Sequence, residues 1–212
     1  MCALSTPTDS RRSGEATRLR RAQLNVEALE VAREAGDEIG VSLALVGLSR
    51  VVFRDGDYDR VRTLATEARE LASRAGEPAD ETGPLHMLAA GTRLSGDYDR
   101  ARELYLESLE LNRRLGKERM VHVELHNLGH VELHRGDLAA AERAFAECSE
   151  AKAGSDDAYD RAMELLNRAA LAAARGRTSA KLLDECEAIL EQAGITLDPD
   201  DRFEVDVLRA RR

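Results

Sequence analysis

Four of the five histidines in this chain fall at four-residue intervals on one short stretch, as His122, His126, His130 and His134. Residues four apart share one face of an α-helix, so this spacing predicts a helix that carries a stripe of imidazoles. The fifth histidine, His86, stands forty residues before His126. Imidazoles can bind a metal ion, titrate near pH 6.5, or hydrogen-bond a polar ligand.

His126 and His130 are the candidate pair for a metal ion, because imidazole nitrogens bind Zn²⁺ well. The whole stripe is about 18 Å long at the rise of an α-helix, so its four rings do not meet at one ion. The sequence places no cysteine or second-helix carboxylate to complete a shell, and the His-Glu-x-x-His pattern is missing. We therefore expect no metal and no cofactor. The preferred interpretation is a polar surface that hydrogen-bonds water or a ligand, and a pH sensor is a third interpretation.

Other residue patterns do not indicate catalysis. The glycines are spread by a regular period, whereas a phosphate-binding loop clusters them, and no Gly-x-Ser-x-Gly elbow occurs. Cys148 falls at a small-residue position that predicts a buried thiol. Asp200 and Asp201 fall at a helix start, where capping explains them. We expect a protein that is not an enzyme.

The elements that position the histidines follow from an internal repeat. Gly56–Arg60 returns letter for letter as Gly96–Arg100, and a weaker copy begins at Gly136. A second glycine series lies between these turns, and includes Gly154. A period of forty residues indicates a stacked array of helix pairs, in which each unit buries its apolar face against its neighbours.

Each interval of about twenty residues between glycines holds one helix, with glycine near the carboxyl end and aspartate capping the next helix. A first helix is expected over 16–35, and Pro84 is expected in the first turn of its helix. A short helix is expected to open at Asp198-Pro199 and run to about Arg209. The paired helices are expected over 38–54, 57–74, 81–94, 97–115, 119–134, 137–152, 157–174 and 179–193.

Composition fits a soluble intracellular protein. The chain has 212 residues, a net charge of −9, only 3% aromatic residues and three cysteines. The negative charge argues against a nucleic-acid surface, and no apolar run is long enough to cross a membrane. An odd number of widely spaced cysteines predicts a reducing compartment, so we expect a cytoplasmic location.

One unit carries a specific family resemblance. It reads Leu125-x-x-Leu128-Gly129, then a Gly-Asp turn, then Ala141-x-x-x-Phe145. This resembles the tetratricopeptide (TPR) pattern, in the forty-residue form found in bacterial transcriptional regulators and signalling ATPases. The resemblance implies an all-α, right-handed superhelix of about four TPR-like helix pairs with capping helices. It divides the chain into a disordered polar tail (1–15), a repeat domain (16–194) and a C-terminal capping helix (195–212).

The resemblance also implies a function. TPR arrays bind protein or peptide segments in a concave groove, so we expect a non-enzymatic binding module in bacterial regulation or signalling, with a homodimer left open. The groove, with its cations, imidazoles and amides, suits an extended peptide or an acidic partner segment. The alternative is a small-ligand or metal-ion sensor, or an atypical enzyme, that uses the histidine stripe. The family's groove positions fall on Arg50, Phe53, Arg54, His86, Met87, Arg93, His126, Asn127, His130, His134 and Asn167.

Overall fold

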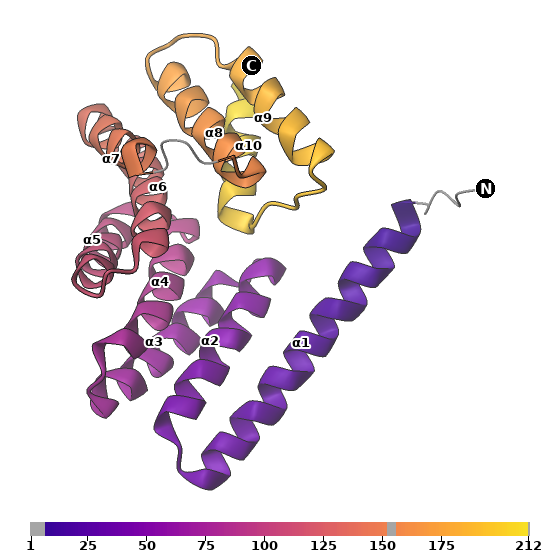
Figure 1. Cartoon of the computed structure of the whole chain (residues 1–212), viewed down its shortest axis with the longest axis vertical. Coiled ribbons are helices and arrows are strands. Elements are labelled where there is room, and N and C mark those ends of the chain that lie inside the picture. The colour runs from indigo at the N-terminus through magenta and orange to yellow at the C-terminus, as the bar shows by residue number, and fades with distance from the viewer. Residues whose placement is uncertain (1–6, 152–155, 212) are drawn as a thin grey trace. The chain divides into compact units, whose positions relative to one another are not determined.

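A computed structural model of the chain has an all-α fold (Figure 1). It describes residues 7–151 and 156–211, with side chains from 15–150 and 156–211. Within these residues ten helices follow one another with no strand between them. Helices that are neighbours in the sequence pack together, as α2 does on α3, α6 on α7 and α8 on α9. The predicted all-α fold of sequential helix pairs is confirmed.

The chain divides into two compact units between Met87 and Leu88. The first unit contains α1 (Pro7–Ala35), α2 (Glu38–Asp55), α3 (Tyr58–Ala75) and the start of α4 (Pro78–Leu94). The second unit contains the rest of α4 and the remaining helices, which are α5 (Tyr98–Arg114), α6 (Glu118–Arg135), α7 (Leu138–Ala151), α8 (Ala158–Ala174), α9 (Ala180–Gln192) and α10 (Pro199–Ala210).

Glycine ends the helices where the repeat predicts it. Gly56 and Gly136 follow α2 and α6 with φ of 80° and 81°, a left-handed conformation that a residue with a Cβ adopts only with strain. The next residue caps the following helix. The carboxylate of Asp97 accepts a hydrogen bond from the amide of Arg100 at 3.1 Å, and Asp137 accepts one from Ala140 at 2.9 Å. These turns confirm the glycine–aspartate interpretation; Gly154 lies outside the described residues.

Two helix starts differ from expectation. Helix α1 begins at Pro7, so it includes residues 7–15 of the predicted tail, whose first six residues lie outside the described range. Helix α4 begins at Pro78, which places Pro84 inside the helix and not in its first turn. Pro78 at the helix start explains the difference, because a proline there loses no hydrogen bond.

The core of the first unit is made of small aliphatic side chains. Helix α3 turns four fully buried residues inward, namely Val61, Ala65, Ala68 and Ala72. Their spacing of three or four residues forms one face of the helix, as the repeat predicts. Ser42 of α2 donates a hydrogen bond to the carbonyl of Ala68 at 2.8 Å, which shows how closely these two helices approach.

In the second unit, α6 and α7 meet at a glycine. A Cβ added to Gly129 would lie 2.3 Å from the ring of Phe145, which is too close for two carbon atoms that are not bonded to each other. The Leu128-Gly129 and Ala141-x-x-x-Phe145 positions of the repeat are therefore the contact between these two helices. A separate apolar cluster joins α8, α9 and α10 through buried residues that include Leu166, Leu183, Val205 and Leu208.

None of the described helices combines the length and the apolar character that a membrane crossing requires.

Candidate binding site on the histidine helix

The histidine stripe lies on α6, and its middle is buried. His130 is fully buried, His126 is 6% exposed, and His134 is partly exposed near the end of the helix. His122 is partly exposed in the first turns, where its backbone carbonyl accepts a hydrogen bond from the thiol of Cys148. The predicted surface for a ligand is therefore covered, and the side chains that cover it identify its chemistry.

The cover is the last helix, α10. Nε2 of His126 lies 2.9 Å from Oδ1 of Asp201, whose other oxygen accepts a 2.7 Å hydrogen bond from the hydroxyl of Tyr159 on α8. A carboxylate only accepts hydrogen bonds, so His126 donates through Nε2–H. A histidine on α6 and a tyrosine on α8 together hold one carboxylate of α10.

Glu204 lies one helical turn further along α10 and meets three cationic or imidazole groups. Arg93 of α4 donates to its Oε1 at 2.6 Å, and Nε2 of His134 lies 2.9 and 3.1 Å from its two oxygens. Nδ1 of His130 lies 3.4 Å from Oε2. Glu204 is 4% exposed, so these interactions replace most of the water around its charge.

Arg93 is the fixed positive charge of the site. Its side chain is fully buried, and it donates a second hydrogen bond to the amide oxygen of Asn127 on α6 at 2.5 Å. A carboxylate oxygen of Asp200 lies 3.9 Å from its guanidinium. Burial acts to lower the pKa of Arg93, but Glu204 and the other nearby acidic groups outweigh it and raise the pKa. The guanidinium is therefore always charged.

His130 is held neutral at neutral pH. Burial lowers its pKa to about 4, against the opposing effect of Glu204. Its Nε2 lies 3.1 Å from the amide oxygen of Asn167 on α8. The neutral ring has a single N–H, which it donates from Nε2 to the amide oxygen of Asn167, while Nδ1 lies beside Glu204 without a hydrogen bond. His130 therefore adds no second buried positive charge beside Arg93.

The two carboxylates of α10 are held in their charged forms. Burial alone would raise the pKa of Asp201, but hydrogen bonds from His126 and Tyr159 lower it to about 2. Burial would likewise raise the pKa of Glu204. Arg93 and the hydrogen bond from His134 outweigh burial and hold the pKa of Glu204 well below its usual value. The site is built for anionic oxygen.

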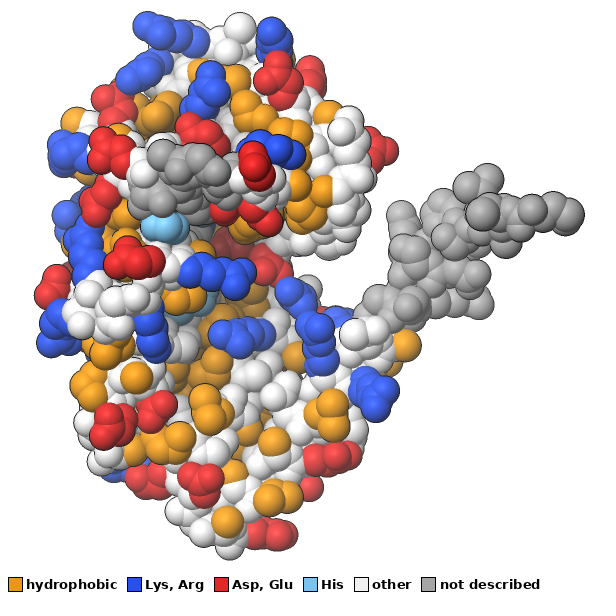
Figure 2. Space-filling view, in the orientation of Figure 1, with side chains coloured by type: hydrophobic (Ala, Val, Ile, Leu, Met, Phe, Trp, Pro, Cys, Tyr) orange, Lys and Arg blue, Asp and Glu red, His pale blue; other side chains and the backbone are white. Residues whose placement is uncertain are grey.

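Aromatic rings enclose the exposed end of the stripe. The ring of Tyr98 stacks on His134 with centroids 4.6 Å apart and planes 7° from parallel. Phe203 of α10 packs on His134 as well, with a centroid distance of 5.5 Å. On the side drawn in Figure 2, histidine occupies only small areas, while acidic, basic and hydrophobic side chains are mixed over much of the remaining surface.

We name two surfaces of the second unit from these contacts. The histidine face comprises Arg93 of α4, His126, Asn127, His130 and His134 of α6, and Tyr159 and Asn167 of α8. The acidic face of α10 comprises Asp200, Asp201 and Glu204, which are buried together. The structure thus brings together six of the eleven residues expected to line a groove, and adds Tyr159.

The other five expected groove residues belong to the first unit. Arg50 and Arg54 are exposed on α2, one turn apart. Phe53 is buried and packs edge-to-face on Tyr58 at 5.8 Å. On α4, His86 is partly buried and Met87 is buried. The two arginines are the side chains of this set that solvent reaches most easily.

The metal alternative gains no support from the geometry. Across 7–151 and 156–211, no group of three or more histidine, cysteine or acidic side chains is arranged to hold a metal ion. His126 and His130 pack edge-to-face with centroids 4.8 Å apart, and each directs Nε2 to a different partner. A shared ion would require both rings to abandon those hydrogen bonds.

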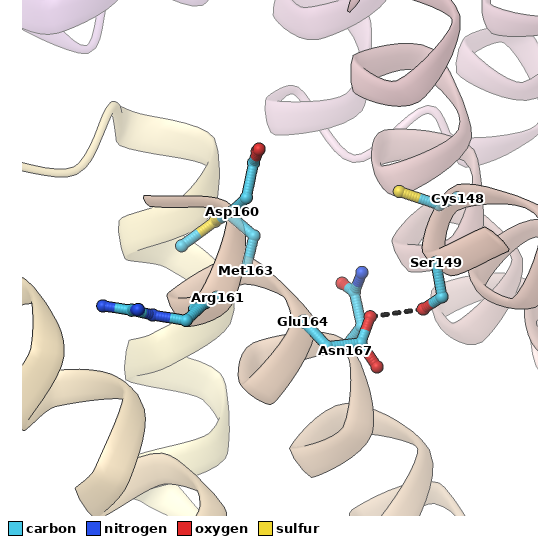
Figure 3. Close-up of a pocket in the computed structure, with 7 residues that line it drawn as sticks. All are labelled: Cys148, Ser149, Asp160, Arg161, Met163, Glu164 and Asn167. Carbon is cyan, nitrogen blue, oxygen red and sulfur yellow. Dashed lines mark hydrogen bonds between the residues drawn. The ribbon is translucent and has the colours of Figure 1, made fainter. Parts of the chain in front are cut away.

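A small pocket lies between α7 and α8 (Figure 3), with a volume of about 220 Å³. Ser149 donates a hydrogen bond to Glu164 across it, and Arg161 points away from that pair. Asn167 lines both this pocket and the histidine face. The thiol of Cys148 is hydrogen-bonded to the backbone carbonyl of His122, so this thiol is not paired with a base in the pocket.

Sequence reasoning missed the partner of the stripe. It assigned Asp200 and Asp201 to helix capping, whereas both side chains are buried and Asp201 binds His126. One signal was present: Asp201 and Glu204 are three apart, so they share a helix face and match histidines spaced by four.

Known structures place the fold. The sequence matches no protein-family model and no curated protein. A variant of the nearly identical TPR-like repeats of a kinesin light chain candidate from Podosopora anserina is 13% identical to this chain. Its TM-score is 0.65 over 87% of this chain and 92% of that one. The fold is that of a TPR-like helical repeat.

Two further structures agree. Another structure of the Podosopora anserina repeats gives a TM-score of 0.62 at 14% identity, over 90% of this chain and 99% of that one. BtubC (BKLC) from P. vanneervenii gives 0.55 at 18% identity, over 86% of this chain and 94% of that one. At such identities the likeness concerns how the helices pair.

Proposed function

We propose that this chain is a non-enzymatic protein-binding module whose histidine face recognises an acidic segment of a partner protein. The observation that carries the proposal is the set of contacts between Asp201, Glu204 and the histidine face. This face already holds two carboxylates of a helix in charged form. A partner segment with the same charges would meet donors placed for it.

The chemistry of the face favours binding over turnover. Its one fixed charge, Arg93, is buried in an ion pair, and His130 has its pKa lowered by burial. By resemblance to TPR arrays of bacterial regulators, the proposal extends to a cytoplasmic regulatory or signalling role. The buried free thiols Cys148 and Cys186 fit a reducing compartment. In the first unit, Arg50 and Arg54 stay predictions for contact with a partner.

The test uses the chain with Asp201→Asn and Glu204→Gln, which keeps the shape of α10 and removes the charges that occupy the face. Fluorescence anisotropy measures binding of labelled helical peptides of equal length whose net charge runs from acidic to basic. We expect the acidic peptides to bind most tightly. Adding His126→Ala and His134→Ala should weaken that binding at least tenfold, because each loses a donor to a carboxylate.

A matched control is Arg143→Ala on the exposed surface of α7, which should leave binding unchanged. Circular dichroism confirms that each variant keeps its helix content. Equal affinity for acidic and basic peptides would contradict the proposal.

A further inference from the structure

The acidic face of α10 has the wrong chemistry for a helix that only covers an apolar core. Five residues of α10 are buried, and three of them are the carboxylates Asp200, Asp201 and Glu204. The other two, Val205 and Leu208, join the apolar cluster of α8 and α9. A helix that serves only as a cap would turn mainly aliphatic side chains inward.

Burying carboxylates makes the attachment of α10 specific but weak for its length. Each charge gives up its water, and the ion pairs and hydrogen bonds of the histidine face roughly repay that cost. Net stabilisation then comes from Val205, Leu208 and the partly buried Phe203. Helix α10 has only 12 residues, a length at which an isolated helix is marginally stable in water.

The connection to the rest of the chain keeps α10 close to its site. Helix α9 ends at Gln192 and α10 begins at Pro199, so a short segment joins them. A short tether gives an effective concentration in the millimolar range. A free helix displaces α10 when the ratio of its concentration to its dissociation constant exceeds the ratio of that effective concentration to the dissociation constant of α10, so a weakly attached α10 lowers the threshold.

From these contacts we propose that α10 is an internal competitor, which occupies the histidine face until an acidic helix of a partner protein displaces it. The ligand class is an amphipathic helix with two carboxylates three residues apart and an aromatic residue just before the second. In α10 these are Asp201, Phe203 and Glu204, which contact His126, His134 and Arg93. This inference rests on the proposed function and adds the form of the ligand and its regulation.

The first part of the test compares two chains. The probe is a labelled peptide with the sequence of residues 197–211, and the chains are the unmodified one and the Asp201→Asn, Glu204→Gln variant. We expect the variant to bind the peptide at least tenfold more tightly, because its own α10 competes less well. A chain with Asp206→Asn is the matched control, since Asp206 lies on the exposed side of α10, and it should bind as the unmodified chain does.

The peptide itself is controlled in the same way. A peptide with amides in place of the carboxylates of Asp201 and Glu204 should lose binding to the variant chain. A peptide with the Asp206 position changed to asparagine should keep it. This pair separates recognition of the acidic face from general attraction to negative charge.

The second part uses only the unmodified chain. Hydrogen exchange is followed in the unmodified chain with and without excess peptide. We expect the amides of α10 to exchange faster when the peptide is present, while those of α6 stay protected. Equal peptide affinity for the two chains, or peptide binding without faster exchange in α10, would overturn the inference.

Other outcomes separate this inference from the proposal on which it rests. If the peptide binds neither chain, the proposed function fails too. If the unmodified chain forms a concentration-dependent dimer in which α10 is exchanged between copies, the occupant is a second copy of this chain, and the inference of a partner protein is overturned. Light scattering across a hundredfold range of concentration measures this.

Discussion

Three side chains decide what the second unit can hold, and each contributes a different property. Arg93 supplies a permanent charge, His126 a directed N–H donor, and His130 a neutral ring between Glu204 and Asn167. A charge-only site would attract any anion, whereas this combination also fixes where each carboxylate oxygen lies.

The neutrality of His130 makes stability depend on pH. It is faced by Glu204 of α10, Asn167 of α8, His126 of α6 and Arg93 of α4. Its folded pKa of about 4 lies below the unfolded value near 6.5, so the unfolded chain binds the proton more readily. The contribution of neutral His130 to the free energy of unfolding is therefore complete above pH 6.5 and is lost as the pH falls toward 4.

We expect the free energy of unfolding to fall by about 2 kcal/mol from this group between pH 6.5 and 5. Urea denaturation of the chain and of His130→Gln at several pH values measures the difference. The variant keeps a polar side chain of similar reach that does not titrate, so its curve should be flatter. Parallel curves would show that His130 is not the responsible group.

The ion pair of Arg93 and Glu204 predicts strong non-additivity. Arg93→Met leaves Glu204 buried without its cation and should cost about 3–5 kcal/mol of stability, because the charge has lost most of its water. Combining it with Glu204→Leu should recover most of the loss, since two apolar side chains then replace the pair.

The control for this cycle is an exposed pair. Arg175 donates to Glu142 at 2.7 Å, with both side chains about 40% exposed. Arg175→Met should cost less than about 1 kcal/mol. Chemical denaturation measures the unmodified chain, Arg93→Met, Glu204→Leu, their combination and Arg175→Met. Costs of the two single changes that add up in the combination would contradict a buried ion pair.

At the scale of helices, the repeat predicted the elements well. The glycine and aspartate positions gave α2, α3, α5, α6, α8 and α9 to within a residue or two, because local backbone geometry sets a helix end. The expected short helix after Asp198 is α10. Local signals of this kind need no knowledge of the rest of the chain.

The occupant of the histidine face was not predictable in the same way. Asp201 lies 75 residues after His126 in the sequence. Its capping interpretation satisfied every local rule, since acidic residues are favoured in a first turn. The contacts of α10 with α6 and α8 are what distinguish a capping aspartate from one that binds the histidine face. No position of the repeat predicts these contacts. Burial of carboxylates is a tertiary property.

The contact of α6 with α7 gives a test at this scale. Gly129→Ala should destabilise the chain by about 1–3 kcal/mol, because the added methyl group meets the Phe145 ring and the helices must separate. Gly83→Ala in α4 is the matched control, since its nearest neighbour is a methyl group of Val46 at 3.6 Å. That change should be neutral or slightly stabilising, as alanine favours helix. Thermal melts measure both, and equal effects would contradict the close approach.

At the scale of the whole molecule, the net negative charge of the chain repels the acidic segment that the histidine face is proposed to bind. The chain carries a net charge of −9, yet the histidine face binds carboxylates. Long-range repulsion should slow the approach of an acidic peptide, while the short-range donors hold it once it arrives. The superhelical arrangement of the repeats and the predicted domain limits stay predictions.

This balance predicts an unusual dependence on salt. The association rate of an acidic peptide with the Asp201→Asn, Glu204→Gln chain should rise several-fold between about 50 and 300 mM salt, because screening removes the repulsion. Stopped-flow fluorescence measures the rate. A rate that falls with salt would mean that the local field of Arg93 and the histidines controls the encounter.

One turn of the repeat has a consequence for how such sites arise. Tyr58 and Tyr98 belong to identical five-residue segments, yet Tyr58 packs on Phe53 and Tyr98 stacks on His134. A duplicated turn can therefore keep its original duty while one copy gains a new neighbour and a new role. Comparing the copies by letter would treat the two tyrosines as equivalent.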